Sequence, residues 1–378
     1  MSIMTPARFR DRFPMLEKSV HLASCSQGAR SIELDESLDK MMNSMTEEGA
    51  PWGIWMGEVE NARALFAAYI NASVEEIAIV PNASVGAFQV ASTMDYSSRR
   101  GVVTTDMEFP SIAHVWLAQR PHGAVVTYAP ENDGYVEVSE YVKLIDSQTN
   151  LVSIPMVSYK NGARLPVSEI VDHAHKSGAR VFVDAYQAAG VVPIDVQSLK
   201  CDYLVAGTLK YMLGIPGVAF LYVRNGVADQ IDPQLTGWFG RVNPFAFDPR
   251  NIDFPIDARR METGTPSIPS IYGANAGLSL LNLLDPEVAW KHVRGLVRKT
   301  ADLLGGMGYA LYLPRDESRW GPQVAVHSSD PDKMSALLKE HNIFSSPRGE
   351  VVRLSFHYYN TDSDVESCAR AFSEYQSI

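Results

Sequence analysis

A carboxylate and a primary amine stand at the ends of two neighbouring apolar segments of the sequence. Asp184 ends the run Val181–Asp184, and Lys210 follows shortly after the run Tyr203–Ala206. Short apolar runs of this kind are typical of buried strands. When two such strands lie parallel in one sheet, the loops at their carboxyl ends direct both side chains into the same crevice. The sequence therefore predicts a site in which an amine and a carboxylate lie together.

The same segment suits a cofactor with an aldehyde and a pyridine ring, pyridoxal 5'-phosphate (PLP). A lysine forms an imine with the aldehyde, while a carboxylate keeps a proton on the pyridine nitrogen and makes the ring an electron sink. Gln187 and the hydroxyl of Thr208 lie close to this pair in the sequence. Each residue alone has an ordinary explanation, for instance a helix cap or a solvated lysine. Together they predict a PLP site on Lys210.

From about residue 77 the sequence alternates short apolar runs with amphipathic stretches. The expected strands are Ile77–Val80, Gly101–Thr105, Ala124–Tyr128, Leu151–Met156, Val181–Asp184, Tyr203–Ala206 and Ala219–Val223. The expected helices between them are Ser84–Met94, Ile112–Gln119 and Val167–Ser177. Strands and helices that alternate at this spacing form βαβ units, so we expect an α/β fold with a mostly parallel sheet.

The character of the sequence changes after Gly264-Thr265-Pro266. Two long helical stretches, Ser270–Leu284 and Pro286–Gly305, lead to weaker strands at Gln323–Val326 and Val351–Ser355 and then to a terminal helix. We therefore expect a smaller α+β domain at the C-terminal end. The predicted division is an N-terminal segment that packs on the small domain, a PLP-binding large domain and the small domain, with bounds 1–20, 21–262 and 263–378.

The composition of the 378 residues limits the class of protein. Hydrophobic residues make up 46% and charged residues 20%, which is ordinary for a folded globular protein. The formal net charge of −11 argues against a nucleic-acid partner. No apolar stretch approaches the roughly 20 residues that a membrane span needs, and the N-terminus lacks an apolar signal segment. We therefore expect neither a nucleic acid nor a membrane as partner.

The cysteines and histidines indicate neither a disulfide framework nor a metal site. Cys25, Cys201 and Cys368 are far apart and odd in number, which indicates a reducing compartment, so we expect a cytoplasmic chain. His173 and His175 lie two positions apart on a predicted helix and therefore face different directions. No metal is expected.

The block from Val181 to Lys210 resembles the fold-type-I PLP enzymes of the class V aminotransferase group, which includes cysteine desulfurases, isopenicillin N epimerase and kynureninases. The resemblance covers nearly the whole chain, from His21–Gly28 to Arg353–Thr361. It implies a three-layer α/β/α large domain with a mainly parallel sheet of seven strands. It also implies a homodimer with shared active sites and a small-molecule α-amino acid as substrate.

The resemblance implies roles for the residues around the lysine. Lys210 resembles the Schiff-base lysine and the catalytic base of the group. Asp184 resembles the partner of the pyridine nitrogen, and Gln187 resembles the residue beside the phenolic oxygen of the ring. Thr208 resembles a ligand of the cofactor phosphate.

Further segments resemble other parts of the cofactor site. Ala83 and Ser84 lie between a predicted strand and a helix, where free N–H groups favour a phosphate, although Ser84 is also an ordinary N-cap residue. Phe109 stands where many relatives have a ring-stacking histidine, as in kynureninases, and its alternative is a core residue. Trp238 resembles a tryptophan that helps to bind phosphate or substrate. Thr265 resembles a threonine that reaches the phosphate of the neighbouring subunit, or it is a plain turn residue.

Two residues are expected at the substrate. Arg353 resembles the arginine with which desulfurases bind the α-carboxylate, a task that suits a planar bidentate donor. Its alternative is an arginine in a surface ion pair. Tyr159 lies in a segment that is similar to kynureninases, and we expect it to contact the substrate or to act as an acid or base. Its alternative is a packing tyrosine at a strand end.

Departures from the family pattern narrow the expected reaction. The loop Asn342–Gly349 has no cysteine where persulfide-forming desulfurases need one, so that activity is not expected. Kynureninases usually carry a histidine at the position of Gln187 and a tyrosine at that of Leu209. We expect Lys210 to act as general base at Cα of an amino acid. We favour transamination over cleavage at Cβ by a C–S lyase or kynureninase-type hydrolase, and both over racemisation or epimerisation.

Overall fold

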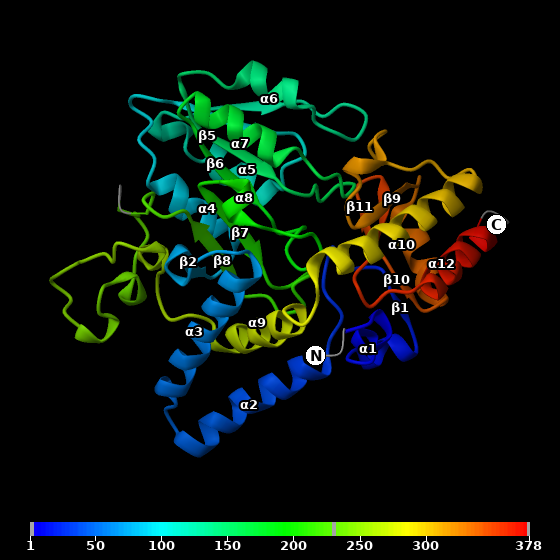
Figure 1. Cartoon of the computed structure of the whole chain (residues 1–378), viewed down its shortest axis with the longest axis horizontal. Helices are drawn as coiled ribbons and strands as arrows, with labels where there is room; N and C mark the ends of the chain where they lie inside the picture. The colour runs from blue at the N-terminus through cyan, green and yellow to red at the C-terminus, as the bar shows by residue number, and fades with distance from the viewer. Residues whose placement is uncertain (1–3, 229–231, 376–378) are drawn as a thin grey trace.

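A seven-stranded sheet forms the centre of the molecule, in the order β2-β8-β7-β6-β5-β3-β4 (Figure 1). The computed structural model describes residues 4–228 and 232–375, so residues 1–3 of the predicted N-terminal segment and 376–378 of the predicted small domain lie outside the described residues. The strands are β2 (Ile77–Val80), β3 (Gly101–Thr105), β4 (Val125–Ala129), β5 (Thr149–Pro155), β6 (Arg180–Asp184), β7 (Tyr203–Gly207) and β8 (Ala219–Val223). The run β7-β6-β5-β3-β4 is parallel, and β8 is antiparallel to β2 and β7. The prediction of a mainly parallel sheet of seven strands is confirmed.

Helices cover both faces of this sheet. On one face, α4 (Ala83–Ser92) and α5 (Pro110–Leu117) share a buried cluster with the strands, and Trp116 of α5 meets Phe182 of β6 edge-on at 5.2 Å between ring centroids. The opposite face carries α3 (Trp52–Tyr69), α6 (Val138–Leu144), α7 (Val167–Lys176) and α9 (Ile268–Leu281). There, Phe66 of α3 stacks on Phe220 of β8 at 4.4 Å. The predicted three-layer α/β/α arrangement is confirmed.

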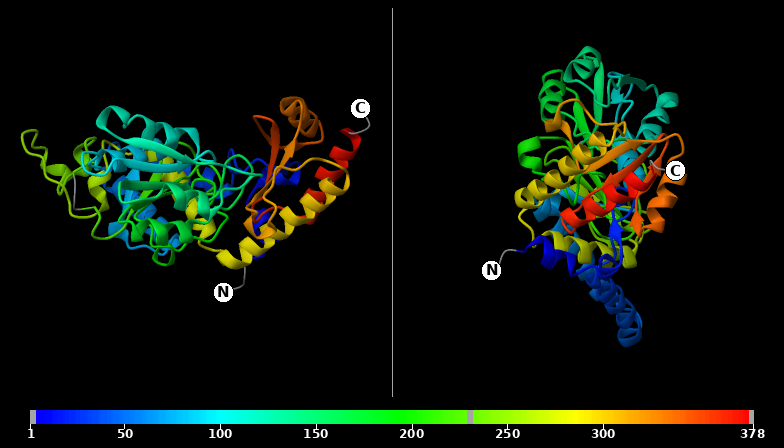
Figure 2. Two further views of the ribbon diagram at one scale, coloured as in Figure 1. Left: turned by 90° about the horizontal axis from the view of Figure 1, so that it is seen from above. Right: turned by 90° about the vertical axis from the view of Figure 1, so that its right-hand side faces the viewer.

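The C-terminal elements form a second group with a small sheet of its own (Figure 2). This sheet has the antiparallel order β11-β12-β9, and a separate parallel pair joins β1 to β10. The strands are β1 (Val20–His21), β9 (Gln323–His327), β10 (Ile343–Phe344), β11 (Ser346–Arg348) and β12 (Val351–Ser355). The helices are α10 (Pro286–Gly306), α11 (Pro331–Glu340) and α12 (Asp362–Tyr375).

The two ends of the chain lie together. In α1 (Pro6–Arg10), Phe9 contacts Tyr358 at 5.6 Å between ring centroids, and Arg10 pairs with Asp364 at 2.8 Å. By contrast, α9 follows the predicted boundary at residue 263 yet packs against α3 and against α2 (Ile32–Glu48) beside the large sheet. The division of the chain into 1–20, 21–262 and 263–378 stays a prediction.

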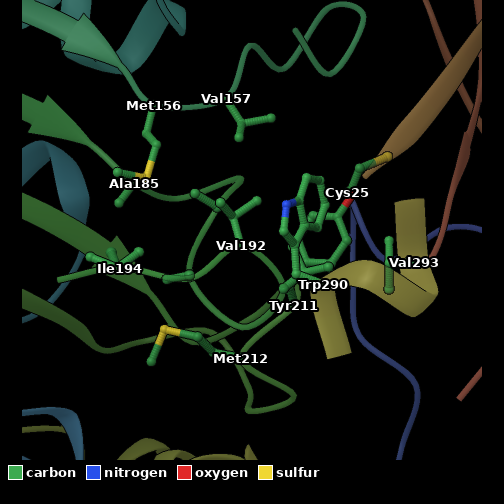
Figure 3. Close-up of a cluster of buried hydrophobic side chains, with 14 of the residues drawn as sticks. Cys25, Met156, Val157, Ala185, Val192, Ile194, Tyr211, Met212, Trp290 and Val293 are labelled. Carbon is green, nitrogen blue, oxygen red and sulfur yellow. The ribbon is translucent and has the colours of Figure 1, made fainter. Parts of the chain in front are cut away.

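A buried cluster connects the large sheet to α10 (Figure 3). It contains Val192 and Ile194 from the segment after β6, and Tyr211 and Met212 from the segment after β7. Trp290 of α10 belongs to the same cluster. The chain that immediately follows Lys210 is therefore anchored in a packed core rather than in a solvated loop.

The buried imidazole of His357 lies beside this cluster, and we expect it to make the protein less stable in acid. Nε2 of His357 lies 3.0 Å from the carbonyl oxygen of Tyr211, and the ring stacks on Tyr359 at 4.7 Å. Burial lowers the pKa of His357 to about 4. Because the unfolded chain takes up a proton near pH 6.5, the unfolding free energy should fall as the pH drops from about 6.5 towards 4, by about 3 kcal/mol from this group.

Urea unfolding at pH 7.5 and 4.5 measures this effect. The variant His357→Phe keeps an aromatic ring but cannot titrate, so its unfolding free energy should depend less on pH than that of the wild type. Equal pH dependence in both proteins would contradict the prediction.

Candidate active site

A cavity of about 280 Å³ opens at the carboxyl edge of the large sheet. Its walls come from the segments that follow β2, β3, β5, β6 and β7, which is where open parallel sheets place their ligands. Of the predicted site residues, it brings together Ala83, Ser84, Phe109, Tyr159, Asp184, Gln187 and Lys210. Residues from distant parts of the sequence thus meet at one place.

The amine of Lys210 lies between two aromatic rings. Its Nζ is 4.5 Å from the ring centroid of Tyr186 and 5.5 Å from that of Phe109. Burial lowers the pKa of Lys210 to about 8; the charge of Asp184 opposes this shift, and those of Arg353 and Arg348 add to it. A lowered pKa increases the fraction of free amine near neutral pH, as a nucleophilic lysine requires.

Two buried carboxyl groups lie beside this amine. Asp184 accepts the N–H of Tyr186 at 2.8 Å; burial raises its pKa, and the Tyr186 N–H and Lys210 oppose the rise. Glu108 accepts hydrogen bonds from the backbone N–H of Phe109 at 2.9 Å and from the hydroxyl of Ser153 at 3.0 Å. Burial and the charge of Asp184 hold the pKa of Glu108 well above its usual range. This favours a neutral Glu108, with Asp184 as the carboxylate that faces a cation.

Two glycines allow the chain around Lys210 to pack closely. A Cβ on Gly207 would lie 2.2 Å from the ring of Tyr186, so only glycine permits that ring to cover the end of β7. Gly190 has a φ of +105°, and a Cβ there would lie 2.1 Å from the carbonyl oxygen of Tyr211. The segments that carry Asp184 and Lys210 can therefore touch.

The remaining polar groups of the cavity fit PLP. Nε2 of Gln187 donates to the carbonyl oxygen of Cys25 at 3.0 Å, while its buried Oε1 has no hydrogen-bond partner in the described part of the chain. At the start of α4, the side chain of Asn82 accepts the N–H of Val85 at 3.0 Å. Other N–H groups of a first helical turn have no partner within the helix and favour an anion such as a phosphate. The cavity thus offers an amine, a carboxylate, an unsatisfied polar atom and a helix N-terminus.

Arg353 lies behind Tyr159 rather than on the cavity wall. Its side chain is 1% exposed, and it donates to the carbonyl oxygen of Tyr159 at 2.8 Å and to the hydroxyl of Ser346 at 2.7 Å. Among the described residues it has no carboxylate partner. A buried guanidinium with neutral acceptors alone is costly, so an anionic ligand would stabilise it.

Three predicted cofactor residues are not brought into the cavity. The hydroxyl of Thr208 is buried and donates to the carbonyl oxygen of Ile215 at 2.7 Å. Nε1 of Trp238 donates to the hydroxyl of Thr265 at 3.3 Å, outside the cavity wall. The roles expected for Thr208, Trp238 and Thr265 stay predictions.

Other residues of the site had no role in the interpretation of the sequence. Tyr186 covers Lys210, Glu108 lies beside Asp184, and Ser346 orients Arg353. The first two stand inside motifs that were recognised, next to Gln187 and Phe109, but burial and pairing leave no signature in a single sequence. Within residues 4–228 and 232–375, no group of three or more His, Cys, Asp or Glu side chains could hold a metal ion, and no helix is long and apolar enough to span a membrane.

Comparisons with known proteins identify the family of the chain. The family model described as aminotransferase class-V matches residues 54–368. The chain is 36% identical over 360 residues to a Bacillus subtilis protein named as the uncharacterized aminotransferase YcbU, covering 95% of each chain. It is 24% identical to a kynureninase of Geobacillus thermodenitrificans, over 92% of this chain and 86% of that relative.

The solved structures support the same fold. The apo structure of a cysteine desulfurase from Thermococcus onnurineus superposes with a TM-score of 0.90 at 23% identity, over 100% of both chains. The family match covers most of the sequence, and the family is a group of PLP-dependent transferases. The expectations of a PLP cofactor and of an enzyme are confirmed. The chain belongs to the class V aminotransferase family of fold-type-I PLP enzymes.

Proposed function

We propose that the protein acts on an α-amino acid and that Lys210 is the amine that holds the cofactor. The observation that carries this proposal is the desolvated Lys210, whose pKa is lowered to about 8 in a cavity that also contains Asp184. When bound, PLP supplies an electron sink that stabilises negative charge at Cα of the substrate. The residues of the chain supply binding, orientation and proton transfer.

Each residue has a task that its surroundings support. Lys210 would hold the cofactor through its amine, and the same amine would act as the base that removes the proton from Cα of the substrate. Asp184 keeps a proton on the ring nitrogen, because a buried carboxylate is stabilised by a neighbouring cation. Arg353 binds the α-carboxylate, and the ring of Phe109 stacks on the cofactor. Ala83 and Ser84 at the start of α4 hold the phosphate.

Transamination is the reaction that we propose first. The Bacillus subtilis relative is named as an aminotransferase, which supports this choice. Persulfide chemistry is not proposed, since the loop Asn342–Gly349 has no cysteine and Cys25, Cys201 and Cys368 are all free and buried.

Free cysteines also support a reducing compartment such as the cytoplasm.

Cleavage at Cβ is the second candidate. The rings of Phe109 and Tyr159 meet edge-on at 5.0 Å and give the cavity an aromatic wall. A kynureninase is among the relatives, and such a wall suits a bulky leaving group. Racemisation or epimerisation comes third.

Titration of the purified holoenzyme with a panel of amino acids tests these alternatives. Conversion to the pyridoxamine form with release of an oxo acid indicates transamination. Formation of alanine, pyruvate or ammonia while the original visible absorption returns indicates cleavage at Cβ. If no amino acid changes the cofactor absorption or is consumed, the proposed function is wrong.

The pKa of Lys210 predicts the pH dependence of cofactor uptake. The neutral amine attacks the aldehyde, so the rate of PLP uptake by apoprotein should rise by about tenfold per pH unit below 8 and level off above it. Stopped-flow absorption between pH 6 and 9.5 measures this rate. A rate that still rises steeply between pH 8.5 and 9.5 would indicate an ordinary, exposed lysine instead.

We also propose that two copies of the chain form a homodimer with shared active sites. Exposed apolar side chains belong to the loop that projects at the left of Figure 1 (residues 235–256), to the second half of α2 and to the first turn of α3. We call the following residues the apolar patch: Met42, Met45, Trp52, Ile54, Leu235, Val242, Phe245, Phe247, Ile252 and Ile256. Trp238 links its parts, since its ring lies 5.8 Å from Trp52 and 5.6 Å from Phe245. Large exposed apolar patches mark interaction sites, and a second copy would also explain why Thr265 lies outside the cavity of its own chain.

Light scattering of the size-fractionated protein tests the dimer. The double variant Phe245→Ser/Phe247→Ser should shift the wild-type dimer towards monomer and weaken PLP retention. Leu283→Ser, which changes an exposed leucine outside the apolar patch, is the matched control. A monomeric wild type with full activity would contradict the proposal.

A further inference from the structure

The hairpin β11-β12 carries two arginines on the same face. Arg353 pairs with Ser346 across the hairpin, and Arg348 pairs with Val351. Residues opposite each other in an antiparallel pair share a face, and so do residues two apart along a strand. Arg348 therefore lies on the face that carries Arg353 and Ser346. The bond of 2.7 Å between Arg353 and the Ser346 hydroxyl agrees with this arrangement.

A short turn fixes the position of Arg348 relative to the cavity. Gly349 and Glu350 alone connect the two strands, and Gly349 adopts the left-handed φ of +57° that such a tight turn needs. The hairpin is attached to the cavity wall, since Arg353 donates to the carbonyl oxygen of Tyr159. Figure 1 shows β11 on the side of the small sheet that faces the large sheet. Arg348 thus stands at the tip of a hairpin that borders the cavity.

The charge of Arg348 acts on two groups of the cavity wall. Burial raises the pKa of Tyr159, and the positive charge of Arg348 opposes that rise more than the charge of Arg353 does. Burial lowers the pKa of Lys210, and both arginines lower it further. The two guanidinium groups therefore make the cavity electropositive on the side of Tyr159.

The side chain of Arg348 is exposed, and its guanidinium forms no hydrogen bond or ion pair with any residue of the described chain. The protein has 44 acidic and 33 basic residues, so carboxylates outnumber the cationic side chains that could pair with them. Arg10, Arg63 and Arg241, for example, each pair with a carboxylate. An unpaired guanidinium beside a ligand cavity is free to bind an anionic group that arrives with the ligand.

We propose that Arg348 binds a second acidic group of the substrate, so that the substrate is an α-amino acid with a carboxylate or similar anion on its side chain. This inference rests on the proposed function, because Arg353 must take the α-carboxylate for Arg348 to meet the distal group. The apolar walls at Phe109, Ile112 and Val157 suit the carbon chain between the two anions. Because both arginines stand on one rigid hairpin, the spacing between them selects the length of that chain.

Pairs of substrates that differ only in the side-chain charge test the proposal. Aspartate is compared with asparagine, and glutamate with glutamine, by turnover and by the change in visible absorption of the holoenzyme. For the better acid, kcat/KM of the wild type should exceed that of its amide at least about tenfold. In Arg348→Met this ratio should fall towards one, a loss of about tenfold or more, mainly through a higher KM for the acid. Arg348→Lys should keep part of the preference, and added salt should weaken it in the wild type because Arg348 is exposed.

Controls separate failure of this inference from failure of the proposed function. Arg370→Met removes an exposed arginine from α12 and should leave the preference as in the wild type. Thermal unfolding and cofactor absorption check that Arg348→Met is folded and loaded. The assignment of Arg348 would be wrong if the wild type used acids and amides equally, or if Arg348→Met kept the preference for the acid. Neither result would contradict the proposed action on α-amino acids. A holoenzyme that responds to no amino acid at all would instead overturn the proposed function.

Discussion

Replacing Lys210 by alanine is expected to abolish the covalent attachment of the cofactor and to reduce kcat by at least about 1,000-fold. Lys210 is the only lysine on the wall of the described cavity, and its lowered pKa makes it a nucleophile near neutral pH. The variant loses the group that binds the aldehyde and the general base at Cα, and a positioned base alone contributes about 10²- to 10⁴-fold. Borohydride reduction followed by mass spectrometry measures the attachment, and single-turnover absorption measures the chemistry.

Two variants make this experiment specific. Lys160 follows Tyr159 in the sequence but does not itself line the cavity. The variant Lys160→Ala should therefore leave cofactor attachment and turnover close to the wild type. Lys210→Arg keeps a positive charge near Asp184 but lacks a nucleophilic amine, so it should behave like Lys210→Ala. Attachment of the reduced cofactor to another lysine, or normal turnover by Lys210→Ala, would show that Lys210 does not carry the chemistry.

The large sheet and its carboxyl edge were predictable because most of the strands are buried on both faces. Such strands appear as continuous apolar runs, and three of them, Ile77–Val80, Gly101–Thr105 and Ala219–Val223, have the predicted bounds. The order of the strands places the ends of β6 and β7 side by side, so Asp184 and Lys210 meet as expected. The long helices α2 and α3 were not predicted; on α3 the apolar residues do not follow one clear stripe.

Burial explains most of what the sequence could not provide. Glu108 and Asp184 are both carboxyls in sequence, and only their surroundings distinguish a group held neutral from one that faces a cation. Arg353 had a surface ion pair as its alternative, yet the structure buries it, and no carboxylate of the described residues pairs with it. The hydroxyl of Thr208 donates to the carbonyl oxygen of Ile215, a contact that the sequence did not indicate, and the phosphate role of Thr208 stays a prediction. These contacts depend on the folded chain, because they join residues that are distant in sequence or that a turn brings together.

Replacing Arg353 by methionine is expected to raise KM for α-amino acids steeply and to lower kcat/KM by about 100- to 1,000-fold. The guanidinium is held by Tyr159 and Ser346 and has no carboxylate partner among the described residues, so the substrate carboxylate would be its first counter-charge. Losing one hydrogen bond between charged groups costs about 1.5–3 kcal/mol, so losing the two bonds of a bidentate pair costs at least about 3 kcal/mol, or more than 100-fold. Cofactor absorption should persist, because Arg353 does not line the cavity that holds the cofactor.

A comparison of substrates with and without the α-carboxylate distinguishes substrate binding by Arg353 from its contribution to packing. The wild type and Arg353→Met are each tested with an α-amino acid and with the primary amine that lacks its carboxylate. Ser346→Ala leaves the charge of Arg353 in place but removes one of the groups that orient it, and should give a smaller loss, about tenfold, for the amino acid alone. If Arg353 binds the α-carboxylate, its removal lowers kcat/KM only for the amino acid, since the amine never made that contact. An equal loss for both substrates would mean that the buried arginine supports the hairpin and Tyr159 without touching the substrate.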